Sequence, residues 1–143
     1  MKRRMTNDRR GVATVELAVV LPLFLLVLLS IVEFGRAMMV SQLVTTAARD
    51  GGRVAIMGGS SDDEVEQLVR DFLTQTLGVD AGDVIVDVSV TESDGGAGGD
   101  VATAEQGDLC IVHVEVPFDS VSFIPGNYLS GRSLTGDCMM RHL

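Results

Sequence analysis

The chain has 143 residues, with 20 acidic and 11 basic side chains, so its net charge is −9. A sequence-independent nucleic-acid binder needs clustered Lys and Arg against phosphate, and this acidic balance argues against that class. Hydrophobic residues make up 46% of the chain but aromatic residues only 4%, which is unusual for a soluble core. The apolar residues must therefore gather in an aliphatic segment.

Charge and hydropathy divide the chain into parts. Residues 1–11 carry a net charge of +4, and the rest of the chain carries −13. Residues 12–32 (VATVELAVVLPLFLLVLLSIV) form an apolar run whose length, as a helix, matches the roughly 30 Å hydrocarbon layer of a bilayer. Because the basic flank of a span stays in the cytoplasm, we predict a cytoplasmic leader over 1–11, a transmembrane helix over 12–32 and an exported acidic remainder.

A cleaved secretory signal peptide is the alternative interpretation of this region. Such signals share the basic start, but their apolar region is shorter and ends at a small-residue cleavage site. Here the apolar run leads into Glu33 and Arg36 instead. That continuation favours a retained membrane helix.

Glu16 interrupts the apolar run near its start. A carboxylate inside a span costs about 2.5–3.5 kcal/mol on insertion scales, so it either reaches the headgroups or has a functional partner. Gly11 stands five positions before it, directly after a basic leader. This arrangement resembles the processing site of type IV prepilins. The resemblance implies that a membrane-embedded prepilin peptidase cuts between Gly11 and Val12.

Cleavage would supply the missing partner for Glu16. The new α-amino group of Val12 is a cation at neutral pH, and on a neighbouring subunit it would neutralise the buried carboxylate. A glycine before the scissile bond also lets the backbone enter a tight protease site without a side-chain clash. The pattern therefore predicts electrostatic selection of register during assembly.

The segment from Gly11 to Ala55 is similar to the TadE-like family, the TadE/TadF pseudopilins of the tight-adherence, type IVb-like Flp pilus system. The matching features are Val15-Glu16-Leu17, Leu21-Pro22, Glu33-Phe34-Gly35-Arg36, Gln42 and Ala47-Ala48-Arg49-Asp50-Gly51-Gly52-Arg53. Leu17 stands where the family commonly has Phe, and Gly52 where Ala is usual. Neither departure touches the proposed cleavage chemistry.

The resemblance implies a TadE-like pseudopilin or minor pilin that acts in assembly or priming of tight-adherence pili. The partners it implies are the prepilin peptidase, other pilins or pseudopilins, the membrane platform proteins of the system and membrane lipid. It implies a single-pass protein of the cytoplasmic membrane, with a cytoplasmic N-terminus, that reaches the pilus or cell surface after processing. The alternative is an uncleaved, membrane-anchored envelope protein whose acidic domain binds an exported partner.

The residues after the span predict that the same helix projects beyond the bilayer, so that the TadE-like region over 11–55 includes a helix extension. Apolar residues recur there at helical spacing. Gly51-Gly52 and Gly58-Gly59 offer two places for the helix to end. Small residues along this helix permit close packing, either on other membrane helices or on the protein's own globular part. They are Gly35, Ala37, Ser41, Ala47 and Ala48.

Residues 60–143 predict a small exported acidic domain. Ser61-Asp62-Asp63-Glu64 is a capping box, and the apolar stripe that follows ends at Gly78, so we expect a helix over 62–77. The predicted fold class is α+β: a long N-terminal transmembrane, pilin-like helix followed by a domain with one helix and about three antiparallel strands.

The strands are predicted from alternation of apolar and polar residues. Residues 84–90 and 109–116 alternate with the period of a half-buried strand, and a weaker third strand is expected over 133–141. A glycine-rich loop over 94–100 separates the first two strands. The helix over 62–77 is expected to cover the valine face of this sheet.

Cys110 and Cys138 fall on the second and third predicted strands. A cross-strand disulfide is one prediction and two buried free thiols the alternative, because Cα atoms more than about 7 Å apart exclude the bond. With His113 and His142, the cysteines have the ligand count of a zinc site. An offset of three along a strand sends Cys110 and His113 to opposite faces, which argues against that site.

Four acidic residues surround the glycine-rich loop, namely Asp94, Asp100, Glu105 and Asp108. Carboxylates on a flexible segment suit calcium, but these lack the ordered spacing of a calcium loop, and a solvated acidic surface is the favoured interpretation. The two histidines have no nucleophile in a motif, and no glycine pattern opens a helix to cradle phosphate. We therefore predict a protein that is not an enzyme and needs no metal or cofactor.

Overall fold

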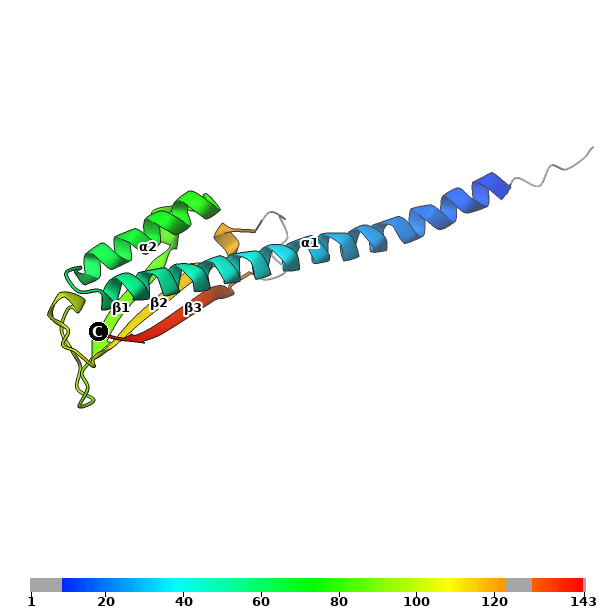
Figure 1. The fold of residues 1–143 in the computed structure, drawn as a ribbon. Helices are drawn as coiled ribbons and strands as arrows, with labels where there is room; N and C mark the ends of the chain where they lie inside the picture. Colours follow the sequence, from blue (N-terminus) through cyan, green and yellow to red (C-terminus); the bar gives the residue numbers. More distant parts are fainter. Residues whose placement is uncertain (1–8, 123–129, 143) are drawn as a thin grey trace, which may run out of the picture.

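The computed structural model describes residues 9–122 and 130–142, so most of the predicted leader lies outside the described residues. Its main elements are α1 (Arg9–Ile56), α2 (Asp62–Leu77), β1 (Ile85–Thr91), β2 (Leu109–Pro117) and β3 (Ser133–Arg141). Short 3-10 turns are η1 (Ala81–Asp83), η2 (Val101–Thr103) and η3 (Phe118–Ser120). α1 is a long rod, and the other elements gather around its second half (Figure 1). This arrangement confirms the predicted α+β class.

α1 changes its surroundings at the predicted membrane boundary. Over residues 11–32 every side chain is exposed except that of Ser30, which is half-buried. Glu33 is the first buried residue and is only 3% exposed. The buried positions that follow lie on one side of the helix and are Val40, Val44, Ala47, Ala48, Gly51, Gly52 and Ala55. α1 is long and apolar enough to cross a membrane, and its exposed first half coincides with the predicted span.

The helix does not end at Gly51-Gly52, the first predicted end, but just before Gly58-Gly59, the second. α1 continues across Gly51 and Gly52 to Ile56, and Gly58 and Gly59 then leave the helix with φ values of 75° and 89°. The two internal glycines lie where α1 touches other elements. A Cβ on Gly51 would lie 2.6 Å from a methyl carbon of a valine in α2, and a Cβ on Gly52 would lie 2.7 Å from a sulfur in β3. Their small size therefore serves packing, not helix termination.

α2 begins and ends as the sequence predicts. The Ser61 hydroxyl accepts the Glu64 N–H, and the Glu64 carboxylate accepts the Ser61 N–H, which completes the capping box. Gly78 closes the helix in the left-handed conformation at φ 70°. Its buried side faces α1 and β1 through Val65, Val69 and Leu73.

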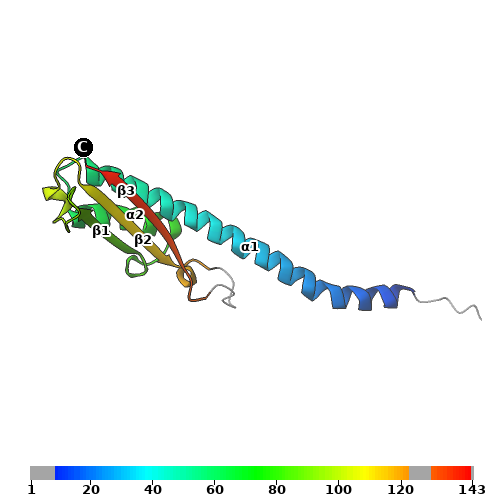
Figure 2. The same cartoon turned by 90° about the horizontal axis from the view of Figure 1, so that it is seen from below.

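The three strands form an antiparallel sheet with β2 in the centre. The observed bounds agree with the predicted strands to within a residue, and β3 has the predicted bounds. The inward-facing residues of β1 and β2 are Val86, Val88, Val90, Cys110, Val112, Val114 and Val116. Both helices cover this one face of the sheet, as the two views show (Figures 1 and 2). The prediction that α2 packs on the valine face omitted α1, which contacts β2 and β3.

α1 lies close to the backbone of β3. A Cβ on Gly136 would stand 2.9 Å from the backbone N and Cα of Thr45, so only glycine fits there. Ala47 and Ala48 are 2% and 0% exposed, and both belong to the protein's own core. Gly35 has open space around its Cα. Of the two packing alternatives left by the sequence, Ala47 and Ala48 follow the second: they pack on the globular part.

The core therefore extends beyond residues 60–143. Val40, Val44 and Ala55 of α1 share one buried cluster with α2 and the inner face of the sheet. A segment that began at residue 60 would leave that face without one of its two covering helices. The globular unit of the described structure begins near Glu33.

Candidate functional site

The predicted processing residues lie on one face at the start of α1. Gly11, Val12 and Glu16 line a shallow apolar groove together with Val15 and Val19. Val12 is 70% exposed, and a Cβ on Gly11 would meet nothing within 4 Å. Positions 12 and 16 are one helical turn apart, about 6 Å along the axis, so their side chains share a face. The structure brings the three residues together, and cleavage remains a prediction.

The bond between Gly11 and Val12 lies in the first turn of α1, which begins at Arg9. Glycine inside a helix costs about 1 kcal/mol relative to alanine. Glycine at position 11 therefore makes local unwinding beside this bond less costly than another residue would.

A polar site lies at Glu33, where the exposed half of α1 (residues 12–32) meets the half that packs against the domain (residues 33–56). The Ser122 hydroxyl donates to Glu33 Oε1, and Arg36 Nε donates to the Val121 carbonyl at 3.2 Å. Glu33 and Arg36 are one turn apart on the helix, and both hold the segment after η3. Among the described residues, Glu33 Oε2 is buried without a hydrogen-bond partner. Sequence reasoning missed this contact because its partners are 85 and 89 residues apart.

The disulfide predicted between Cys110 and Cys138 is not formed in the structure, where both are buried free thiols. The strand register is the physical reason, because Cys110 stands opposite Met140 and Cys138 opposite Val112. Such diagonal neighbours have Cα atoms about 7–8 Å apart, beyond the usual reach of a disulfide. Burial raises the pKa of both thiols, and the Asp108 charge adds to this effect at Cys110.

The four residues of the candidate zinc set lie apart. Cys110 and Cys138 face the core, whereas His113 is on the outer face of the sheet, with its Nδ1 2.5 Å from Asp137 Oδ1. His142 follows β3 and lies near the turn at Gly58. Over residues 9–122 and 130–142, no group of three or more His, Cys, Asp or Glu side chains is placed to hold a metal.

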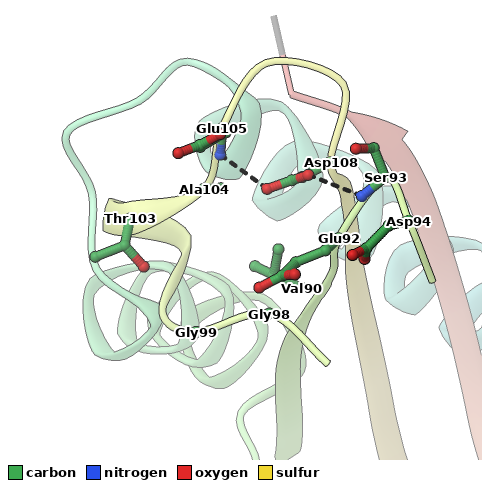
Figure 3. A pocket seen from close by; sticks show the side chains of 10 residues that line it. All are labelled: Val90, Glu92, Ser93, Asp94, Gly98, Gly99, Thr103, Ala104, Glu105 and Asp108. Atoms are coloured by element: carbon green, nitrogen blue, oxygen red, sulfur yellow. Dashed lines mark hydrogen bonds between the residues drawn. The ribbon is translucent and has the colours of Figure 1, made fainter. Parts of the chain in front are cut away.

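A polar cavity of about 340 Å³ lies beside the loops that join β1 to β2 (Figure 3). Its acidic lining consists of Glu92, Asp94, Glu105 and Asp108. Asp108 is only 6% exposed and accepts the backbone N–H groups of Ser93 at 3.0 Å and Glu105 at 2.9 Å. Figure 3 shows that Asp108 thereby connects the segment after β1 with the segment before β2. Three of the predicted calcium residues thus share a cavity, and the most buried one is occupied with backbone hydrogen bonds.

The fourth predicted calcium residue, Asp100, lies at the start of η2 and has another role. Its Oδ1 accepts the Ala102 N–H at 2.8 Å and the Asp62 N–H at 3.3 Å, while Asp62 Oδ1 accepts the Val101 N–H at 2.9 Å. This reciprocal pair ties the start of α2 to the loop. Burial raises the pKa of Asp62, the Val101 hydrogen bond opposes that rise, and the Asp100 charge adds to it.

A long helix that is exposed and apolar over its first half, with a small α+β domain on its second half, has the architecture of a single-pass membrane-anchored protein. Residues 11–53 match the family described as TadE-like protein, which confirms the predicted resemblance over nearly the whole of α1. The match covers less than a third of the chain and indicates a role in tight-adherence pilus systems. Searches of curated proteins and of solved structures gave no match.

Proposed function

We propose that this chain is a TadE-like pseudopilin or minor pilin that prepilin peptidase cleaves between Gly11 and Val12. After cleavage, the protein acts in assembly or priming of tight-adherence pili, together with other pilins and the membrane platform of the system. Its N-terminus faces the cytoplasm before processing, and its acidic domain is exported.

The two-part character of α1 carries the proposal. The half from Val12 to Val32 has exposed side chains at every position except Ser30, and it needs an apolar environment from lipid or from other subunits. The half beyond Glu33 is built into the domain, so the domain travels with the helix as one body. A subunit that passes from membrane to fibre requires both properties.

Glu16 supports the assembly role on electrostatic grounds. Its side chain lies in an otherwise apolar groove beside Val12, where a new N-terminal ammonium would appear after cleavage. A carboxylate in a membrane-embedded bundle is costly unless it is paired. An ammonium from a neighbouring processed subunit has the complementary charge, so only a processed neighbour in the correct register satisfies Glu16.

N-terminal sequencing of the mature protein tests the cleavage. The full chain is expressed with and without a prepilin peptidase, and the mature chain is expected to begin at Val12 only when the peptidase is present. Gly11→Arg should block this step, whereas Gly35→Arg, at another glycine of α1 with open space around it, should be processed normally. A chain from the native host that still begins before Val12 would reject the pilin proposal and leave an uncleaved envelope protein.

Glu16→Ala and Glu16→Gln test the assembly step separately. Both are expected to be processed at Gly11 but to enter pili poorly, because both remove the charge that pairs with an ammonium. Thr14→Ala, two positions away on the same helix, is the control and should assemble normally. Normal incorporation of both Glu16 variants would reject the charge-pairing mechanism while leaving cleavage intact.

A further inference from the structure

The exposed apolar surface of α1 does not stop where the predicted span stops. Val32 is the last residue of that span, yet Phe34, Met38 and Met39 are 62%, 65% and 52% exposed. Further along the helix the exposed side turns polar and charged, beginning at Gln42. About one and a half turns of apolar helix surface thus lie between the span and the polar part of α1.

The apolar surface beyond the predicted span forms one side of a groove between α1 and the domain. Phe34, Ala37, Met38 and Gln42 of α1 line it from one side and Leu134 of β3 from the other, around a volume of about 320 Å³. The groove stands at the level where the domain first touches α1. The Glu33–Ser122 and Arg36–Val121 contacts described above fix that edge of the domain to the helix, so the groove keeps its height along α1.

The length of the apolar surface identifies what covers it. At 1.5 Å per residue, residues 12–32 extend over about 31 Å and residues 12–39 over about 42 Å. The hydrocarbon layer of a bilayer is about 30 Å thick, and the bilayer with its headgroup layers is about 40–45 Å thick. The first length matches the hydrocarbon layer. The seven residues after it extend about 10 Å further, on the exported side only, which is enough to pass through the headgroup layer there.

We propose that the groove lined by Phe34, Met38 and Leu134 is a membrane-docking surface that seats the domain in the phospholipid headgroup layer, against the glycerol and upper acyl region. It takes phospholipid as its ligand while the protein is membrane-anchored. The inference rests on the proposed membrane span and not on cleavage or entry into a pilus. Burying these side chains at the interface sets the height and inclination of the domain on the membrane before any assembly partner binds.

Tryptophan fluorescence tests the proposal cleanly because the chain has no tryptophan of its own. Single substitutions Met38→Trp, Phe24→Trp and Met57→Trp place one reporter in the groove, one in the middle of the span and one at the far end of α1. All three positions are exposed, so the fold should tolerate them. Each full-length variant is reconstituted into phosphatidylcholine vesicles that contain lipid with a nitroxide on the headgroup or, separately, at mid-chain.

The expected result is a different quencher preference at each position. M38W should lose emission with the headgroup nitroxide, F24W with the mid-chain nitroxide, and M57W, about 38 Å beyond Val32 along the helix, with neither. Phe34→Trp gives a second reporter in the groove and should behave as M38W does. Circular dichroism of each variant should match the original chain.

Three results would overturn the proposal. If M38W and F34W emit at long wavelength and neither nitroxide quenches them while F24W is quenched, the groove stands clear of the membrane. If they emit at short wavelength, resist both nitroxides and change with the protein-to-lipid ratio, a second copy of the chain fills the groove instead. If F24W also escapes quenching, the membrane span itself is rejected, whereas cleavage at Gly11 is judged independently by N-terminal sequencing.

Discussion

The two halves of α1 share one continuous helical backbone and differ in what surrounds them. From Val12 to Val32 the helix is mostly apolar, and every side chain is exposed except that of Ser30, which is half-buried. From Glu33 to Ile56 it has one buried side, rich in small residues, and one exposed side. The exposed half coincides with the predicted membrane anchor and the other half is a core element, so one continuous helix joins the two.

The largest effect is expected from a substitution that forces α1 away from the sheet. Gly136→Ala places a methyl group 2.9 Å from the α1 backbone at Thr45, and overpacking of this kind costs about 1–3 kcal/mol. Urea unfolding of the full chain in detergent micelles, followed by circular dichroism, should show this loss. Gly35→Ala is the matched control: it has open space and should be neutral or stabilising. Equal stability of the two variants would contradict the close contact between α1 and β3.

Truncating one valine in each half compares the two environments directly. Val44 is fully buried in the core, and Val44→Ala should lower the free energy of unfolding of the domain by about 1–3 kcal/mol through lost burial and a cavity. Val27 lies in the exposed half, where it is 49% exposed, and Val27→Ala should leave domain unfolding unchanged. The same urea titration measures both. A similar loss from Val27→Ala would mean that the exposed half also stabilises the domain.

The boundary between the halves is tested at Ser122. Ser122→Ala removes the hydroxyl that donates to the buried Glu33 carboxylate, and we expect a loss of about 1–2 kcal/mol, because hydrogen bonds to charged groups are among the stronger ones. Ser130→Ala is the control, since its hydroxyl makes only a 3.4 Å contact with Asp119 at an exposed site. Faster amide exchange around Val121 in the first variant alone would show that this contact holds the domain edge.

The smallest effect concerns the thiols in the core against which α1 packs. Cys110 and Cys138 should resist maleimide at pH 8 in the folded chain and take up two labels in urea without reductant, as mass spectrometry will show. Met57→Cys adds an exposed thiol and should react at once. A chain that takes up no label in urea without reductant would contain the disulfide instead.

These thiols also predict how stability changes with pH. Burial raises the pKa of both thiols in the folded chain above the ordinary value of 9.0. As the pH rises above that value, the unfolded chain loses the thiol protons first and is favoured, so stability should fall with rising pH. Cys138→Ala should reduce this dependence. A slope unchanged by the substitution would assign the effect to other groups.

Local patterns of the sequence were enough to predict the elements. The capping box at Ser61 and the stop at Gly78 define α2 because they satisfy backbone groups within a few residues. Strict alternation defines β1 and β2 because one side of each strand is buried. The apolar run over 12–32 predicts the exposed half of α1, because nothing except lipid or other subunits is able to cover such a surface in water.

Contacts between elements that are remote in sequence could not be predicted from local patterns. Gly51 and Gly52 are typical helix ends by local pattern, but they lie inside α1 because α2 and β3 approach there, and those partners are remote in sequence. Register in the sheet, which the pattern leaves open, placed Cys110 and Cys138 diagonally and left them as free thiols. A membrane helix, its candidate cleavage bond and an α+β domain could be predicted from the sequence alone. The fold decided where anchor becomes core, at Glu33, because burial depends on contacts with residues nearly 90 positions away.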